Sequence, residues 1–156
     1  MERSDIHVSK AQLEAQKGIM ELIAQRNDAL GKAPLAFVDT YGCQQNESDS
    51  EKIRGMLSQM GYEMTGDERE ADVIVINTCA VREHAEMRAL GNVGALVHAK
   101  KAHPGQIIAM CGCMVQEPGM AEKIKNSYRH VDLVFGPHVL WRFPEYLLQA
   151  LEGSGR

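Results

Sequence analysis

Three of the four cysteines in this sequence recur at nearly regular intervals. Cys43, Cys79 and Cys113 are 36 and 34 residues apart, and each follows a short apolar run by a few residues. Thiolate sulfur is the ligand that zinc and iron–sulfur clusters share in proteins. If the fold brings these three thiols together, they can form a metal centre.

The apolar runs before the cysteines predict the elements that would bring them together. Leu35 to Val38, Val73 to Ile76 and Ile107 to Met110 are typical of strands that are buried on both faces of a parallel sheet. One βαβ unit occupies roughly 30 or more residues, so each cysteine interval matches one unit. Parallel strands end at the same rim, where open α/β sheets bind ligands. The spacing therefore predicts three thiols on one rim, and hence a metal centre.

Further elements follow the same rhythm. Two shorter strands are expected at Tyr62 to Thr65 and at Asp132 to Phe135. Helices are predicted from the 3.6-residue spacing of apolar side chains and from turn signals. They are expected at 9–30, after a capping-box pattern at 48–51, at about 81–101, in a helix with Pro118 in its first turn, and around 140–151 with Pro144 near the start.

Five strands that alternate with helices predict an α/β fold. We expect a doubly wound, mostly parallel five-stranded sheet of flavodoxin-like or Rossmann-like type, with strand order 2-1-3-4-5. Residues 1–33 are predicted to be an N-terminal helical or flexible extension, because Gly31 to Pro34 interrupts the pattern. Residues 34–151 would form the compact domain, and 152–156 would begin a linker.

Composition limits the classes of protein that fit. The chain has 156 residues, of which 44% are hydrophobic, and this suits one domain with a real core. Its formal net charge of −4 gives no overall basic footprint of the kind that a self-sufficient nucleic-acid binder carries. With no apolar signal segment and no run of about 18 apolar residues, we expect a cytoplasmic protein with no membrane partner.

The cysteines also have less specific interpretations. A single cysteine more often packs in a core than binds a metal, although three at equivalent strand ends reverse that preference. Cys111 and Cys113 should point to opposite sides of the chain. We expect Cys113 at the rim and Cys111 in the core, with Cys111 as a substitute ligand.

The identity of the metal stays open at this point. Structural zinc needs four ligands, commonly from CxxC pairs, and the sequence has no CxxC, so a histidine such as His84 would have to complete the set. An iron–sulfur cluster held by three cysteines leaves one iron open. Catalytic metals keep such an open position.

Three ordered motifs carry a resemblance to a known family. They are TYGCQQNESDSE at 40–51, AD followed by NTCAVR at 71–82, and CGCMVQE at 111–117. Across about 35–150 the sequence resembles the amino-terminal domain of the methylthiotransferases, a radical-SAM family. It looks most similar to the tRNA enzymes that 2-methylthiolate isopentenyladenosine next to the anticodon. The ribosomal-protein methylthiotransferases are the alternative within the family.

The resemblance implies a cofactor in this chain and further functions in separate domains. Cys43, Cys79 and Cys113 would ligate an auxiliary 4Fe-4S cluster, and its open iron would hold the sulfur to be inserted. S-adenosylmethionine and a second 4Fe-4S cluster would belong to a separate radical-SAM domain. A C-terminal RNA-binding domain would help to hold the tRNA substrate. No catalytic side chain is expected in this chain.

The radical-SAM signature CxxxCxxC is absent from the sequence. The chain alone is therefore expected to be inactive, with 152–156 leading toward the missing radical-SAM domain. Two hypotheses of other classes remain. One is a standalone metal- or thiol-dependent redox or binding module on a flavodoxin-like fold. The other is a structural domain with buried thiols that do not converge.

Overall fold

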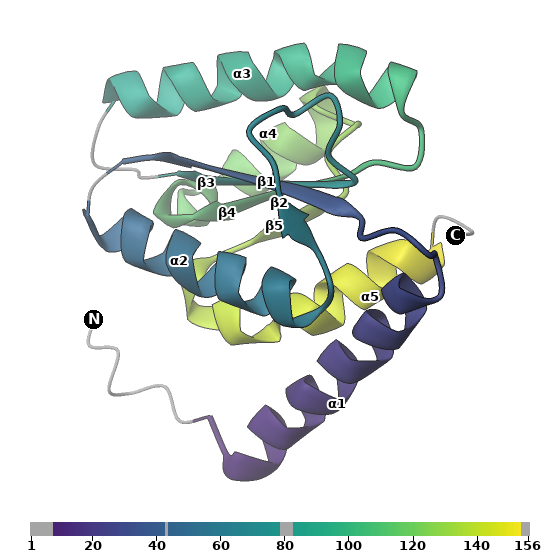
Figure 1. Cartoon of the computed structure of the whole chain (residues 1–156). Coiled ribbons are helices and arrows are strands. Elements are labelled where there is room, and N and C mark those ends of the chain that lie inside the picture. The colour runs from purple at the N-terminus through teal and green to yellow at the C-terminus, as the bar shows by residue number, and fades with distance from the viewer. Residues whose placement is uncertain (1–7, 43, 79–82, 154–156) are drawn as a thin grey trace.

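The computed structural model describes residues 8–42, 44–78 and 83–153. Strands and helices alternate along the chain (Figure 1). The strands are β1 (Leu35–Tyr41), β2 (Glu63–Met64), β3 (Val73–Thr78), β4 (Ile107–Gly112) and β5 (Leu133–Phe135). The helices are α1 (Lys10–Asp28), α2 (Gln44–Gln59), α3 (Glu83–Ala102), α4 (Met120–Ser127) and α5 (Phe143–Gly153), with short 3-10 helices η2 (Cys113–Gln116) and η3 (Pro137–Arg142).

The five strands form one parallel sheet in the order β2-β1-β3-β4-β5. This confirms the predicted doubly wound α/β class and the strand order 2-1-3-4-5. Every residue of β3 and of β4 is buried. The continuous apolar runs are explained by this burial, because strands in the middle of such a sheet face helices on both sides.

Helices cover both faces of the sheet (Figure 1). α3 and α4 pack on one face, where Leu96 and Ile124 join Ile74, Ile76 and other side chains in one hydrophobic cluster. α1, α2 and α5 pack on the opposite face, in a second cluster that includes Cys111. The sheet therefore separates two hydrophobic cores, and the ends of its strands lie at the edges of the layers.

The first helix is tied to the compact part of the fold. Its N-terminus is closed by a capping box, in which Ser9 Oγ accepts from the Gln12 amide and the Gln12 side chain accepts from the Ser9 amide. Ile23 is completely buried in the core, and Asn27 Nδ2 donates to the carbonyl of Met60 at 2.8 Å. The division of the chain at residue 33 remains a prediction.

Two expected helix starts are wrong by a few residues. α2 begins at Gln44, four residues before the capping-box pattern at 48–51, so Ser48 and Glu51 lie inside the helix instead of at its start. α4 begins after Pro118, because Gly119 has φ +78° and cannot continue a right-handed helix. Pro144 is the second residue of α5, as expected. Among the described residues, no helix has the length and apolarity that a membrane span requires.

Candidate functional site

Three strands end side by side at one edge of the sheet. Tyr41 of β1 pairs with Thr78 of β3, and Thr78 pairs with Gly112 of β4. Neighbouring strands lie about 4.8 Å apart. In the sequence, Cys43 follows Tyr41 by two residues, Cys79 follows Thr78 directly, and Cys113 follows Gly112 directly. The register thus brings together the chain segments that lead into the three predicted ligands.

The two cysteines of the third motif have different environments. Cys111 is 1% exposed and packs in the core on the α2 and α5 side of the sheet. Burial raises the pKa of its thiol above the ordinary value, and the charge of Asp49 adds to that shift. Cys113 is half-buried and begins η2 just past the strand end. The expectation that Cys111 belongs to the core is confirmed, whereas the ligand role of Cys113 stays a prediction.

The other two predicted ligands cannot be compared in the same way. Cys43 and Cys79 lie outside the described residues, and so does the His84 side chain, although its backbone belongs to α3. Among the side chains that the structure describes, no three of His, Cys, Asp or Glu lie close enough together to hold a metal ion. The convergence of the three thiols therefore remains a prediction.

Gly112 allows β3 and β4 to approach closely at this edge. Its φ is +103°, and a Cβ at this position would lie 2.1 Å from the carbonyl oxygen of Thr78 and 2.6 Å from Asn77 Oδ1. A side chain here would clash with backbone, which cannot move away as a flexible side chain would. Glycine is therefore required between Cys111 and Cys113.

A buried hydrogen-bond network joins the same strand ends. Asn77 Nδ2 donates to the Asn46 carbonyl at 2.7 Å and to Ser50 Oγ at 3.0 Å. Asn46 Nδ2 donates to Asn77 Oδ1 at 3.2 Å and to the Thr78 carbonyl at 3.1 Å. Thr40 Oγ1 lies 2.7 Å from Ser50 Oγ. We call Thr40, Asn46, Ser50, Asn77 and Thr78 the carboxyl-edge network.

This network was missed by the reasoning from sequence. Asn46 and Asn77 belong to the first two motifs, but no role was predicted for them beside the cysteines. The available signal was the polar Asn77-Thr78 pair at the end of a fully buried strand. A buried amide needs partners, so such a residue in a core strand indicates a specific polar contact.

Tyr41, at the end of β1, has a raised pKa. Burial, together with the charge and hydrogen bond of Asp39, raises the pKa of Tyr41 to about 12. Tyr41 therefore remains a neutral phenol at physiological pH.

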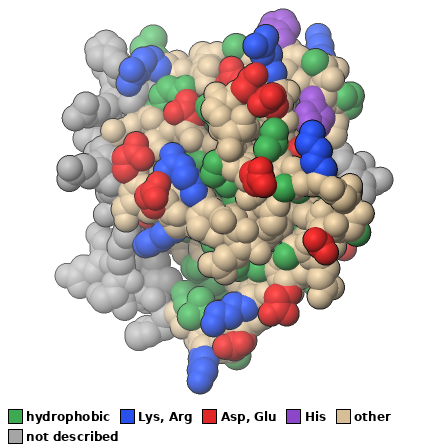
Figure 2. Space-filling model, in the orientation of Figure 1, with side chains coloured by type: hydrophobic (Ala, Val, Ile, Leu, Met, Phe, Trp, Pro, Cys, Tyr) green, Lys and Arg blue, Asp and Glu red, His purple; other side chains and the backbone are tan. Residues whose placement is uncertain are grey.

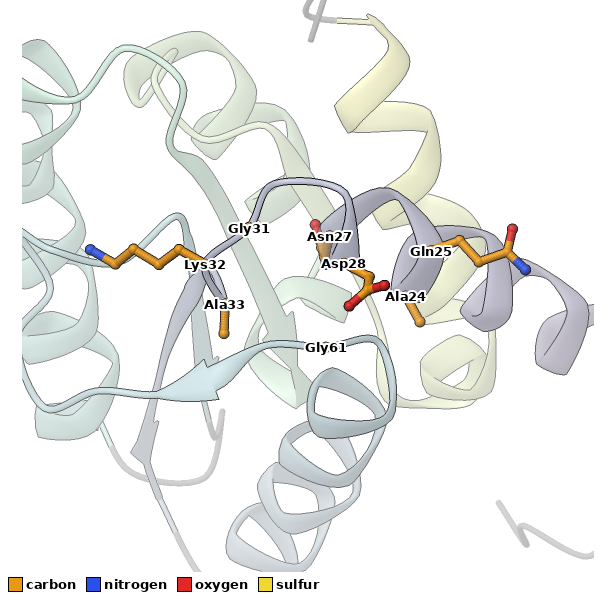
Figure 3. Close-up of a pocket in the computed structure, with 8 residues that line it drawn as sticks. All are labelled: Ala24, Gln25, Asn27, Asp28, Gly31, Lys32, Ala33 and Gly61. Carbon is orange, nitrogen blue, oxygen red and sulfur yellow. The ribbon is translucent and has the colours of Figure 1, made fainter.

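Two hollows of the described surface are lined by residues other than Cys113. One of about 590 Å³ lies between α1 and the turn after α2, next to the segment that leads into β1, and is therefore at the amino ends of the strands (Figure 3). In Figure 3, Gln25 and Lys32 extend away from its centre. A second hollow, of about 530 Å³, lies between α2 and η3 beside Trp141. Neither hollow resembles an enclosed substrate pocket for the chemistry predicted at the rim.

The visible surface carries mixed charge. Figure 2 shows acidic and basic side chains interspersed over the face that it presents, with no large basic field. This agrees with the net charge of −4. An extended basic surface, as in proteins that bind nucleic acid by charge alone, does not appear on this face.

The comparisons with known proteins agree with the motifs. Residues 36–136 match the family model described as "Uncharacterized protein family UPF0004". A relative from Alkaliphilus oremlandii, named tRNA-2-methylthio-N(6)-dimethylallyladenosine synthase, is 48% identical over 153 residues, which cover 98% of this chain and 32% of the relative. Relatives of the same name from Clostridioides difficile and Clostridium tetani are 42% and 53% identical, over 97% and 73% of this chain and 33% and 25% of their own lengths.

The chain spans about a third or less of the length of these relatives. Because the family model covers most of the folded part, from β1 to the end of β5, the resemblance read from the three motifs is confirmed. The chain belongs to the UPF0004 family, and its similarity is to one part of synthases that are about three times as long.

Proposed function

We propose that this chain is the amino-terminal, sulfur-supplying domain of a tRNA methylthiotransferase. The whole protein would 2-methylthiolate isopentenyladenosine (dimethylallyladenosine) next to the anticodon. The observation that carries the proposal is the similarity to named tRNA-2-methylthio-N(6)-dimethylallyladenosine synthases across 98% of this chain. The family match over 36–136 covers most of the same residues, including all three cysteine positions.

Within this proposal, Cys43, Cys79 and Cys113 are the ligands of an auxiliary 4Fe-4S cluster. Support comes from the pairing of Tyr41, Thr78 and Gly112, since these residues directly precede the three cysteine positions or lie within two residues of them. Half-burial of Cys113 suits a thiolate that must reach a metal yet be shielded from bulk water. The strand register and the half-burial of Cys113 therefore support a three-thiolate cluster.

When bound, such a cluster supplies an iron with an open coordination position for the sulfur that is transferred. The chain itself supplies the scaffold. Gly112 lets the β4 end approach β3, and the carboxyl-edge network holds the start of α2 against the end of β3. Cys111 packs in the core and is not assigned to the metal.

The remaining parts of the reaction are assigned to the rest of the longer protein. The sequence has no CxxxCxxC, so S-adenosylmethionine and the second 4Fe-4S cluster would be bound by a radical-SAM domain. A C-terminal RNA-binding domain would hold the tRNA, in keeping with the net charge of −4 here. We place the activity in the cytoplasm, with no membrane partner.

The proposal is tested with the full-length gene in a bacterial strain that lacks the modification. Its tRNA is hydrolysed, and 2-methylthio-N6-isopentenyladenosine is measured by liquid chromatography and mass spectrometry. The wild-type gene should restore the nucleoside, the Cys113→Ala gene should not, and the matched Cys111→Ala gene should retain most of the activity. A wild-type gene that restores nothing, or a Cys113→Ala gene that restores the nucleoside fully, would refute the proposal.

A further inference from the structure

Asn77 occupies the centre of the carboxyl-edge network. It lies on the middle strand β3, and its side chain is 1% exposed. The amide group donates twice to α2, to the Asn46 carbonyl and to Ser50 Oγ, and accepts once from Asn46 Nδ2. An amide can donate two bonds and accept at its oxygen, so these contacts use both of its functions.

The same contacts join segments that are far apart in the sequence. Asn46 is the third residue after Cys43, and Asn77 is the second residue before Cys79. Their reciprocal hydrogen bonds therefore tie the chain just after one proposed ligand to the chain just before another. Asn46 is 3% exposed, so water competes little with these bonds.

The third segment is fixed to the same place. Thr78 Oγ1 donates to the carbonyl of Cys111 at 3.1 Å. Gly112 lies so close to Asn77 that any Cβ would come within 2.6 Å of Asn77 Oδ1. The end of β4, directly before Cys113, is thus held against the amide of Asn77.

These hydrogen bonds are made by amides, hydroxyls and backbone carbonyls. A carboxylate in place of the Asn77 amide would replace the two N–H donors with an acceptor oxygen. This oxygen would face the Asn46 carbonyl oxygen, and the two would repel each other. It would also add a negative charge beside thiolates. Reduction potentials of iron–sulfur clusters depend on nearby charge and on hydrogen bonding.

We propose that Asn77 is a positioning residue that sets the spacing of the three cysteine-bearing segments through neutral hydrogen bonds. The inference rests on the proposed function, since it concerns the same cluster site. Asn77 acts through the backbone of α2 and β4 and does not itself bind the metal. Asn46 is its partner in this role.

The chain offers a matched control at the opposite edge of the sheet. Gln106 is completely buried, and its Nε2 donates to the carbonyls of Glu68 and Ala71, both at 2.9 Å. Gln106→Glu therefore makes the same chemical change as Asn77→Asp, from a doubly donating buried amide to a carboxylate. It does so at the start of β4 instead of at the end of β3.

The test uses anaerobic reconstitution of the chain with iron and sulfide. Irons per chain, the reduction potential of the bound cluster and the midpoint of urea unfolding are measured for the wild type, Asn77→Asp and Gln106→Glu. Both variants should be less stable than the wild type. Only Asn77→Asp should lose most of its iron, or bind it at a lower potential, when the variants are compared under conditions in which both are folded.

The outcomes separate the two claims. A wild-type chain that binds no iron would refute the proposed function and the role of Asn77 with it. An iron-loaded wild type beside an Asn77→Asp chain with unchanged iron and potential would overturn only the inference. Equal iron loss in Gln106→Glu would also overturn it, because general destabilisation would then explain the result.

Asn46→Asp decides the question if Asn77→Asp does not fold. Residue 46 lies in the first turn of α2, where the helix dipole favours a carboxylate, so this variant should fold. It replaces the donor to Asn77 Oδ1 and to the Thr78 carbonyl with an acceptor. Iron loss or a lowered potential supports the inference, and wild-type values contradict it.

Discussion

The two edges of the sheet hold their strand ends with different polar side chains. At the amino edge, two carboxylates hold the strand starts beside the Gln106 amide: Asp72 Oδ2 accepts from the Leu35 amide at 2.8 Å, and Asp132 Oδ2 accepts from the Ile108 amide at 2.9 Å. Basic side chains lie against both, with His103 next to Asp72 and Lys100 next to Asp132. At the carboxyl edge, amides and hydroxyls make the corresponding contacts.

The difference follows from what each edge has to hold. A carboxylate is the stronger acceptor, and a basic partner can neutralise its charge, so it suits an edge whose role is stability. Neutral amides bind more weakly, but they add no negative charge beside thiolate ligands. The amino edge therefore contributes stability, and the carboxyl edge contributes stability together with the proposed cofactor site.

The largest expected effect is the loss of stability when alanine replaces Gly112, compared with the same substitution at Gly31. Gly112→Ala places a Cβ 2.1 Å from the Thr78 carbonyl at the carboxyl edge, whereas Gly31→Ala, at φ +77° near the amino edge, meets no atom within 4 Å. We expect Gly112→Ala to lower the free energy of unfolding by about 3 kcal/mol or more. Gly31→Ala should cost about 1 kcal/mol, from backbone strain alone. Urea unfolding measures both, and equal losses would show that the close approach of β3 and β4 is not important.

The next effect tests whether the carboxylates of the amino edge serve stability alone. Asp132→Asn removes the charge that faces Lys100 Nζ at 2.5 Å and weakens the bond from the Ile108 amide. Because both side chains of the ion pair are less than a third exposed, we expect a loss of about 1–2 kcal/mol. Iron uptake by the folded variant should equal that of the wild type. Loss of iron without loss of stability would contradict the division between the edges.

The smallest effect concerns alkaline pH. Burial, with a further contribution from the charge of Asp72, raises the pKa of Tyr62 from 10.0 to about 12, so the unfolded chain releases this proton at lower pH than the folded chain. The raised value contributes stability that is complete below pH 10 and is lost as the pH rises toward 12. The stability advantage of the wild type over Tyr62→Phe should therefore fall by about 1 kcal/mol between pH 8 and pH 11.

Urea unfolding at both pH values checks this difference, and Tyr41→Phe is the counterpart at the carboxyl edge. The pKa of Tyr41 is also raised to about 12, but Tyr41 is only partly buried, so water screens its interactions. The stability difference between the wild type and Tyr41→Phe should therefore fall less between pH 8 and pH 11. A Tyr62 variant whose stability difference is independent of pH would contradict the buried, neutral phenol.

Much of the fold could be predicted from the sequence because the signals were local. The continuous apolar runs before the cysteines and the interval of one βαβ unit indicated central parallel strands, and the strand order followed from the expected flavodoxin-like class. The start of α2 was misplaced because the Ser-x-x-Glu pattern at 48–51, which is typical of a helix start, here lies inside the helix. The carboxyl-edge network was missed because its partners come from segments about 30 residues apart.

Iron counting with Mössbauer spectroscopy on the anaerobically reconstituted chain tests whether Cys43, Cys79 and Cys113 ligate a cluster. We expect about four irons per chain in the wild type. That iron should be retained in Cys111→Ala, which loses only core packing, and lost in Cys113→Ala. Iron that persists unchanged in Cys113→Ala, or that disappears in a folded Cys111→Ala chain, would contradict the assignment of Cys113 to the metal and of Cys111 to the core.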